Sequence, residues 1–235
     1  MNFGKSLANP LRCPYNNSAK ARAFDRKGGA AVKILLVSDE EDRYLWDFYK
    51  PGHLAGVDMI LSAGDLSAAY LSFLVTMGNC PLLYVHGNHD GAYDRKEPDG
   101  CECVDDRLVT VKGLRILGLG GSAWYNGGPY QYTEQEMARR VWRLSRQLRR
   151  AGGVDIVLTH APVRGYGDQD NQSHRGFEAF LPLLDRWKPR YLVYGHVHKR
   201  YQPGQQRVLQ YGETTLINAN GKYFLDTEDG KTSIE

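Results

Sequence analysis

Short segments rich in β-branched residues recur along this chain, and each is followed by a polar side chain able to bind a metal ion. Each segment is four to six residues long, which suits a buried strand and is too short for a buried helix. The segments and the residues that follow them are 32–37 with Asp39, 57–61 with Asp65, 82–85 with Asn88 and His89, 154–158 with His160, and 191–194 with His196 and His198. In α/β sheets, ligand chemistry gathers where the strands end. The pattern therefore predicts that these side chains share one site.

Segments with helical periodicity lie between the strands and predict an α/β fold. They span 44–49, 67–77 and 133–150. The last is the clearest, because Thr133 and Glu136 form a capping box and an apolar stripe runs from Met137 to Leu148. Further strands, joined by tight turns, predict a second and partly antiparallel sheet; they span 108–111, 115–119, 207–211, 214–218 and 222–225.

The composition of the chain excludes several classes of protein. Its 235 residues, 42% hydrophobic and 24% charged, suit one globular domain. No apolar run approaches the roughly 18 residues that span a bilayer, and the first residues do not resemble a secretion signal, so we expect no membrane association. Four irregularly spaced cysteines predict no disulfide framework, which favours a cytoplasmic location.

The basic charge of the chain is concentrated near its N-terminus. The net charge is +3, but residues 1–31 hold six basic residues and one acidic residue, so residues 32–235 carry −2. We predict that 1–31 is a disordered basic tail or a stretch translated from upstream of a true start at Val32, and that 32–235 is a single domain. The arginines of 133–150 are expected to form a solvated surface, so the charge makes no strong case for nucleic-acid binding.

Histidines support a metal site at the strand ends. Six of the seven, all except His53, fall at or beside strand ends. Buried polar groups of one kind need hydrogen-bond partners or a metal, so four such histidines, joined by two aspartates and an asparagine, favour a metal centre over coincidence.

Five motifs in order resemble the calcineurin-like metallophosphoesterase superfamily, over nearly all of 33–200. They are Asp39-Glu40-Glu41, Gly64-Asp65, Gly87-Asn88-His89-Asp90, His160-Ala161-Pro162 and Gly195-His196-Val197-His198. The resemblance implies an α/β fold, a four-layer α/β/β/α sandwich with two mixed sheets. It also implies two metal sites at the mouth of the sheets. Site one takes Asp39, Glu41, Asp65 and His198, whereas site two takes Asp65, Asn88, His160 and His196.

Within the family, this chain is most similar to a small bacterial branch related to cyclic-nucleotide phosphodiesterases. The likeness rests on 160–168 and on His174-Arg175-Gly176. Protein phosphatases of the family carry an Arg-Gly extension after the second motif and a glutamate after Asn-His. Here Leu66-Ser67 and Asp90 stand in those places, so a protein phosphatase is not expected.

The chain departs from the family at Glu41, where most members have histidine. A carboxylate oxygen can replace the imidazole nitrogen, which shifts the preference toward Mn²⁺, with Mg²⁺, Fe and Zn²⁺ as alternatives. The other interpretation is that Glu41 belongs to a solvated acidic helix start. In that case, site one is weak or empty.

The resemblance implies a two-metal phosphoesterase that acts on a small phosphate ester, with phosphodiesters favoured and a nucleotide as one option. A hydroxide held between the ions attacks phosphorus in line, and His89 protonates the leaving oxygen as general acid. The alternatives are a non-catalytic regulatory module on the same metal scaffold and a nuclease of the same superfamily, which would need a basic groove.

Other residues carry weaker predictions. Asn88 and His174 are candidate substrate contacts, and Asp168 is expected to orient the loop of His174. An aromatic cluster in the loop 120–133 is predicted to pack at the edge of the core, with stacking on a nucleobase as the alternative. Its members are Trp124, Tyr125, Tyr130 and Tyr132. The Cys101-x-Cys103 pair lacks a second pair, which argues against a zinc knuckle.

Overall fold

The structure is a computed structural model and describes residues 31–198, 206–227 and 232–233. Two six-stranded sheets form the centre of the described chain. The strands of the first sheet are β14 (Thr232–Ser233), β13 (Gly221–Asp226), β1 (Lys33–Ser38), β2 (Met59–Ser62), β3 (Leu82–Tyr84) and β4 (Glu102–Cys103), in that order. Those of the second are β11 (Val208–Tyr211), β12 (Thr214–Asn218), β10 (Tyr191–Tyr194), β9 (Ile156–Thr159), β6 (Leu114–Leu119) and β5 (Leu108–Val111). A small parallel pair joins β7 (Ser122–Ala123) to β8 (Gln131–Tyr132).

Both large sheets are mixed. In the first, β1, β2, β3 and β4 are parallel neighbours, whereas β13 runs antiparallel to β1. In the second, β12, β10, β9 and β6 are parallel neighbours, and the edge strands β11 and β5 are antiparallel. The parallel strands at each centre all end at one edge of their sheet, which brings the segments that follow them together.

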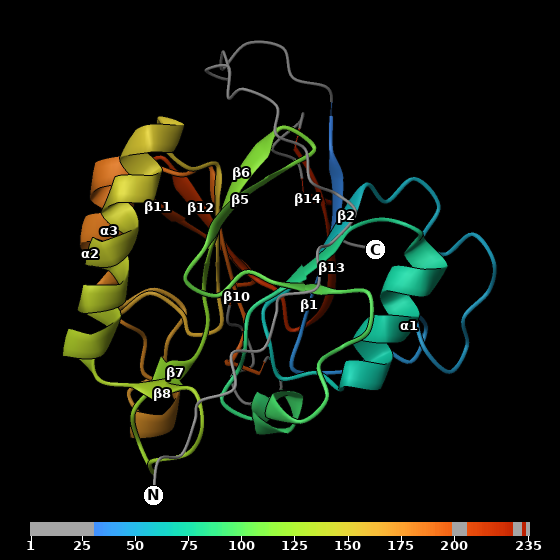
Figure 1. Cartoon of the computed structure of the whole chain (residues 1–235), viewed down its shortest axis with the longest axis horizontal. Helices are drawn as coiled ribbons and strands as arrows, with labels where there is room; N and C mark the ends of the chain where they lie inside the picture. The colour runs from blue at the N-terminus through green and yellow to red at the C-terminus, as the bar shows by residue number, and fades with distance from the viewer. Residues whose placement is uncertain (1–30, 199–205, 228–231, 234–235) are drawn as a thin grey trace, which may run out of the picture.

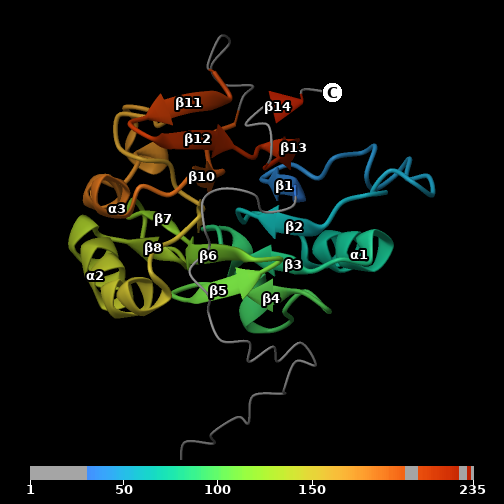
Figure 2. The same cartoon turned by 90° about the horizontal axis from the view of Figure 1, so that it is seen from above.

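Alternation along the strands divides the core into three layers of side chains. Ile34 and Leu36 of β1 pack between the two sheets, whereas Leu35 and Val37 point to the opposite face of the first sheet. The outer face of the second sheet packs against two helices. Figure 2 shows the resulting order, with helix α1 outside the first sheet and helices α2 and α3 outside the second. The predicted α/β/β/α sandwich with two mixed sheets is confirmed.

The helices are α1 (Ala68–Gly78), α2 (Glu134–Ala151) and α3 (Phe180–Trp187) (Figure 1). Helix α2 has the predicted capping box, since the Thr133 hydroxyl accepts from the backbone N–H of Glu136 and the Glu136 carboxylate accepts from that of Thr133. Gly152, with φ at 72°, ends this helix. Two short 3-10 turns span Asp90–Asp94 and Gln172–His174.

One helical expectation was wrong, and one helix was not predicted. Residues 44–49, predicted as a helix, form turns in which Leu45 and Tyr49 donate to carbonyls three residues back and Phe48 donates to Arg43, five residues back. The segment is too short to nucleate a helix, and Pro51 prevents its extension. Helix α3 was not predicted, although Phe180, Leu183 and Leu184 have helical spacing and are buried.

The prediction for 1–31 falls almost wholly outside the described residues, which begin at residue 31. Among the helices that are described, none combines the length and the apolar character needed to cross a membrane.

Candidate metal centre

Four predicted ligands from four different loops meet around one ring nitrogen, Nε2 of His160. The Asn88 Oδ1 and His196 Nδ1 atoms each lie 3.1 Å from it, and Asp65 Oδ2 lies 3.3 Å away. His160 is fully buried, and Asn88 and His196 are almost so. The predicted site two is thus assembled from segments that follow β2, β3, β9 and β10.

The separations between these atoms fit a shared ion. Two ligand atoms about 2.1 Å from one ion lie about 3.0 Å apart at an octahedral angle and about 3.4 Å apart at a tetrahedral angle. The observed separations from Nε2 of His160, 3.1 to 3.3 Å, fall in that interval.

Backbone carbonyls orient both imidazoles toward the same point. His160 Nδ1 lies 2.7 Å from the carbonyl oxygen of Ala63, and His196 Nε2 lies 2.5 Å from that of Ser173. A carbonyl oxygen only accepts, so both of these ring nitrogens must carry hydrogen. When the rings are neutral, Nε2 of His160 and Nδ1 of His196 therefore face each other with lone pairs. Two lone pairs 3.1 Å apart require a cation between them, either a proton or a metal ion.

Tight turns place these side chains. Asp39, Asp65 and His196 have φ of 62°, 57° and 66°, a left-handed conformation that is costly outside glycine. Three predicted ligands in this conformation indicate that the surrounding structure holds them there. A Cβ on Gly87 would lie 2.0 Å from the Asp65 carboxylate, and one on Gly195 would lie 1.9 Å from the Ser38 hydroxyl. Only glycine permits these approaches.

The predicted site one is less tightly gathered. The Asp39 carboxylate is fully buried and accepts from the Ser38 hydroxyl at 2.5 Å and from the backbone N–H of His196 at 2.9 Å. His198 Nε2 lies 3.9 Å from Asp39 Oδ1. Asp39 thus connects the end of β1 to the end of β10.

The structure places the two glutamates after Asp39 differently. Glu41 is exposed, and its Oε1 accepts from the backbone N–H of Ser67, at the start of α1, at 3.3 Å. The Glu40 carboxylate lies 3.7 Å from His198 Nδ1. Assignment of Glu41 as a ligand stays a prediction, and Glu40 is a second carboxylate beside the same histidine.

The charges of the four-residue cluster, formed by the predicted site-two ligands, favour one bound positive charge. Burial disfavours a charged His160, but the neighbouring carboxylates Asp65 and Asp39 outweigh it and raise its pKa to about 9. Burial and the His160 charge lower the pKa of His196 to about 3. Burial opposes ionisation of Asp65, but His160 lowers its pKa to about 2. The carboxylates thus favour a single positive charge within the cluster.

Asp90 ties two of these loops together. Its Oδ2 accepts from the backbone N–H groups of Gly87, at 2.7 Å, and Asp65, at 2.9 Å. Burial and the Asp65 charge raise the pKa of Asp90 to about 6. The sequence analysis predicted no structural role for Asp90. An aspartate three residues after Gly87 is placed to accept a hydrogen bond from the backbone N–H of that glycine, and this spacing could have predicted the contact.

His89 lies beside Asp65 of the cluster, and His174 lies beside His196. The His89 side chain is 73% exposed, and its Nε2 lies 4.0 Å from Asp65 Oδ2. The backbone N–H of His89 donates to Asp65 Oδ1 at 2.8 Å. The His174 ring lies 5.2 Å from that of His196, centroid to centroid.

Asp168 accepts from the backbone N–H groups of Gly165 and Gly176, which agrees with its predicted role in orienting the loop of His174.

Tyr125 was not expected to contact a metal ligand. Its hydroxyl accepts from Asn88 Nδ2 at 3.1 Å, which turns Asn88 Oδ1 toward His160.

Two other members of the aromatic cluster pack as predicted: Tyr130 stacks on His86, with ring centroids 4.2 Å apart, and Tyr132 lies against the Arg140 guanidinium. Trp124 is 44% exposed and does not pack into the core.

His86, Cys103 and Asp105 form a second group of metal-binding residue types. His86 Nδ1 lies 2.7 Å from Asp105 Oδ2, which is a hydrogen-bond distance and is too short for two ligands of one ion. Asp105 Oδ1 also accepts from the backbone N–H of Gly120. The group is therefore a structural link between the loop of Asn88 and the loop that begins at Gly120.

This link predicts a pH-dependent stability. Burial opposes the charged form of His86, but Asp105 raises its pKa to about 10, well above the ordinary value of 6.5. The raised pKa stabilises the folded state fully below about pH 6.5, and this contribution declines as the pH rises to about 10. Urea unfolding at pH 6, 8 and 9.5 should show a steeper decline for wild type than for Asp105→Asn. Parallel declines would contradict the link.

Comparisons of the sequence and of the fold match this chain to known proteins. The sequence profile of the calcineurin-like phosphoesterase family matches residues 33–200. The human metallophosphoesterase domain-containing protein 1 is 26% identical over 229 residues, covering 80% of this chain and 66% of its own length. A UPF0046 protein of Caenorhabditis elegans is 26% identical over 222 residues, covering 82% of this chain and 70% of its own length. Among solved structures, TT1561 of Thermus thermophilus superposes with a TM-score of 0.62 at 18% identity, covering 86% of this chain and 97% of its own.

Proposed function

Because this chain belongs to the calcineurin-like phosphoesterase family, we propose that it hydrolyses phosphoesters, and phosphodiesters in particular, at a centre of two divalent cations. The observation that carries the proposal is the pair of imidazole nitrogens, on His160 and His196, that face each other 3.1 Å apart. Asp65 and Asn88 complete the set of donors around that point.

The donor set suits hard divalent cations. Asp65, Asn88, His160 and His196 would hold one ion, and Asp39, Glu41, Asp65 and His198 would hold the other, with Mn²⁺ as the first choice and Mg²⁺, Fe and Zn²⁺ as alternatives. When bound, such ions neutralise the charge of a phosphate group and lower the pKa of water into the physiological range. The protein fixes where that chemistry occurs, since Asp65 is shared and its carboxylate is held by the backbone N–H of His89.

His89 is placed to act as general acid. Its side chain is exposed at the rim of the cluster, and its backbone is fixed by Asp65, the residue proposed to contact both ions. A proton held at an imidazole nitrogen there can pass to the leaving oxygen of an ester bound in line with the attacking water. We propose a small phosphate ester as the substrate, with a nucleotide as one option.

Metal-dependent hydrolysis of bis-p-nitrophenyl phosphate tests this proposal. After chelation, the protein should be inactive, and Mn²⁺ should restore turnover to well above that of an Asp65→Asn variant given the same Mn²⁺ concentration. An activity that chelation leaves unchanged, or one that is equal in Asp65→Asn, would contradict the proposal. A protein that binds two ions without turnover would favour the non-catalytic module.

Two single substitutions decide which glutamate completes site one. We expect Glu41→Ala to bind one ion per chain where wild type binds two, because Glu41 occupies the place in the sequence motif at which the family carries a ligand. Glu40→Ala is the matched control and should keep both ions. The number of ions bound per chain is measured by atomic emission after dialysis. If Glu40→Ala loses the ion and Glu41→Ala keeps it, the ligand is Glu40.

A further inference from the structure

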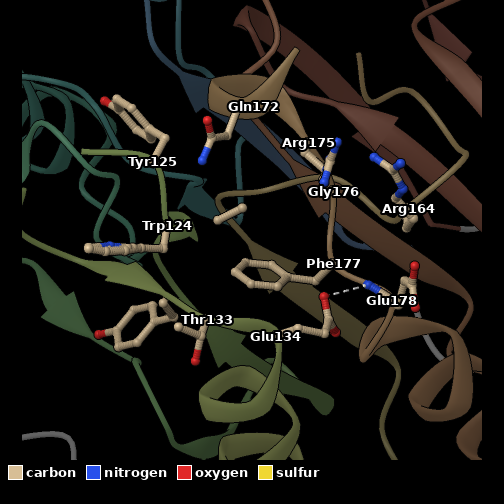
Figure 3. Close-up of a pocket in the computed structure, with 12 residues that line it drawn as sticks. Trp124, Tyr125, Thr133, Glu134, Arg164, Gln172, Arg175, Gly176, Phe177 and Glu178 are labelled. Atoms are coloured by element: carbon tan, nitrogen blue, oxygen red, sulfur yellow. Dashed lines mark hydrogen bonds between the residues drawn. The ribbon is translucent and has the colours of Figure 1, made fainter. Parts of the chain in front are cut away.

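A cavity of about 580 Å³ is lined by segments that contact the proposed metal ligands. This volume lies within the range typical of small-molecule sites. Figure 3 shows Trp124 and Tyr125 on one side of the cavity, Arg164 and Arg175 on the other, and the ring of Phe177 between them. The cavity thus has an aromatic wall and, opposite it, a wall of two arginines (the cationic wall) that Glu178 also lines.

Two contacts join this cavity to the proposed ligands. Tyr125 lines the cavity, and its hydroxyl accepts from Asn88 at 3.1 Å. Gln172 also lines it and directly precedes Ser173, whose carbonyl accepts from His196 Nε2. A molecule with its phosphate at the ions would therefore have its remaining groups beside the cavity.

The aromatic wall is held in place and accessible. The Gln131 side-chain oxygen accepts from three successive backbone N–H groups, those of residues 125–127, at 3.1 to 3.2 Å, which fixes the loop after Trp124. The tryptophan itself is 44% exposed and lines the cavity. A preformed and exposed indole is a stacking surface that costs little ordering entropy on binding.

The two arginines of the cationic wall differ in their ion pairs. The Arg164 guanidinium pairs with Asp168 at 3.2 Å. Glu134 faces the same cavity, but its carboxylate accepts from the backbone N–H groups of residues 178 and 179. Within the described part of the chain, Arg175 makes no ion pair, so its guanidinium is available to donate hydrogen bonds into the cavity.

We propose that this cavity binds a flat aromatic group carried by the phosphoester, of the size of a nucleobase. The ring stacks on Trp124, and Arg175 donates to acceptor atoms on the ring. This inference rests on the proposed function, because it assumes that the phosphate lies at the ions. It assigns to Trp124 the stacking role in place of packing at the edge of the core.

Binding of AMP and of ribose 5-phosphate to the Mn²⁺-loaded protein tests the inference. The two ligands share one phosphate and one sugar and differ in the base. Isothermal titration should show AMP binding at least about tenfold more tightly to wild type, as stacking on one aromatic side chain provides. Trp124→Ala should lower the preference for AMP to the few-fold that Arg175 alone provides, and Trp124→Phe should keep most of the difference. Arg175→Gln should weaken AMP several-fold and leave ribose 5-phosphate unchanged.

Trp142→Ala is the matched control, because Trp142 lies on α2, is 72% exposed and does not line the cavity. It should leave the preference for AMP unchanged. Equal affinities for the two ligands in wild type, or a preference that Trp124→Ala leaves undiminished, would overturn the inference even if metal-dependent hydrolysis is observed. Conversely, a lowered preference in Trp124→Ala supports the cavity even if no ester is hydrolysed, so the two proposals fail separately.

Discussion

Replacing His160 with alanine is expected to remove the ion shared by Asp65, Asn88 and His196 and to lower phosphoester hydrolysis by at least about a thousandfold. The loss is large because His160 Nε2 is the atom around which the other three donors gather, at 3.1 to 3.3 Å. Charge stabilisation by a bound cation contributes several kcal/mol to the transition state, and each 1.36 kcal/mol is a factor of ten in rate. The loss of the ion and the loss of hydrolysis are checked by measuring metal content and turnover on the same preparation.

Two variants separate this effect from a loss of structure. His53→Ala removes the histidine that stacks on Tyr44, away from the cluster, and should keep both metal and activity. Asn88→Ala removes another donor with a smaller change in buried volume and should also lose the ion. If thermal melting shows His160→Ala folded, and it still binds as many ions as wild type, the assignment of His160 is wrong.

The second large effect is expected from His89→Asn. This variant should keep its metal, because the His89 side chain is 73% exposed and lies outside the four-donor cluster. Turnover of esters with poor leaving groups, such as alkyl phosphodiesters, should fall by about 10²- to 10⁴-fold, which is the usual contribution of a general acid. Esters with activated aryl leaving groups should lose little, since their oxygen departs without a proton. An equal loss on both kinds of ester would contradict the role.

The pairing of strand end and ligand could be predicted because two local patterns coincide. The apolar runs before Asp65, His160 and His196 identify buried strands, and the polar residue after each run has no reason to be buried unless it binds something. Helix α2 could be predicted for a similar reason, because its cap at Thr133 and its apolar stripe are both local.

Contacts between loops could not be predicted in this way. His86 stands at a strand end like the ligands, yet its ring bonds to Asp105, nineteen residues later. Tyr125 reaches Asn88 across thirty-seven residues. Glu40 and Glu41 are neighbours in sequence, and only the path of the chain after Asp39 places the first beside His198 and the second on Ser67. Such pairings depend on tertiary packing, which no local period encodes.

Anomalous diffraction from Mn²⁺-soaked crystals tests the central claim most directly. The two imidazoles of His160 and His196 are fixed by carbonyls so that only a cation can lie between their facing nitrogens. The account predicts a manganese peak within bonding distance of His160 Nε2 and His196 Nδ1, with Asp65 and Asn88 completing the coordination. Peaks confined to other parts of the protein, with these four donors left in contact with one another, would contradict it.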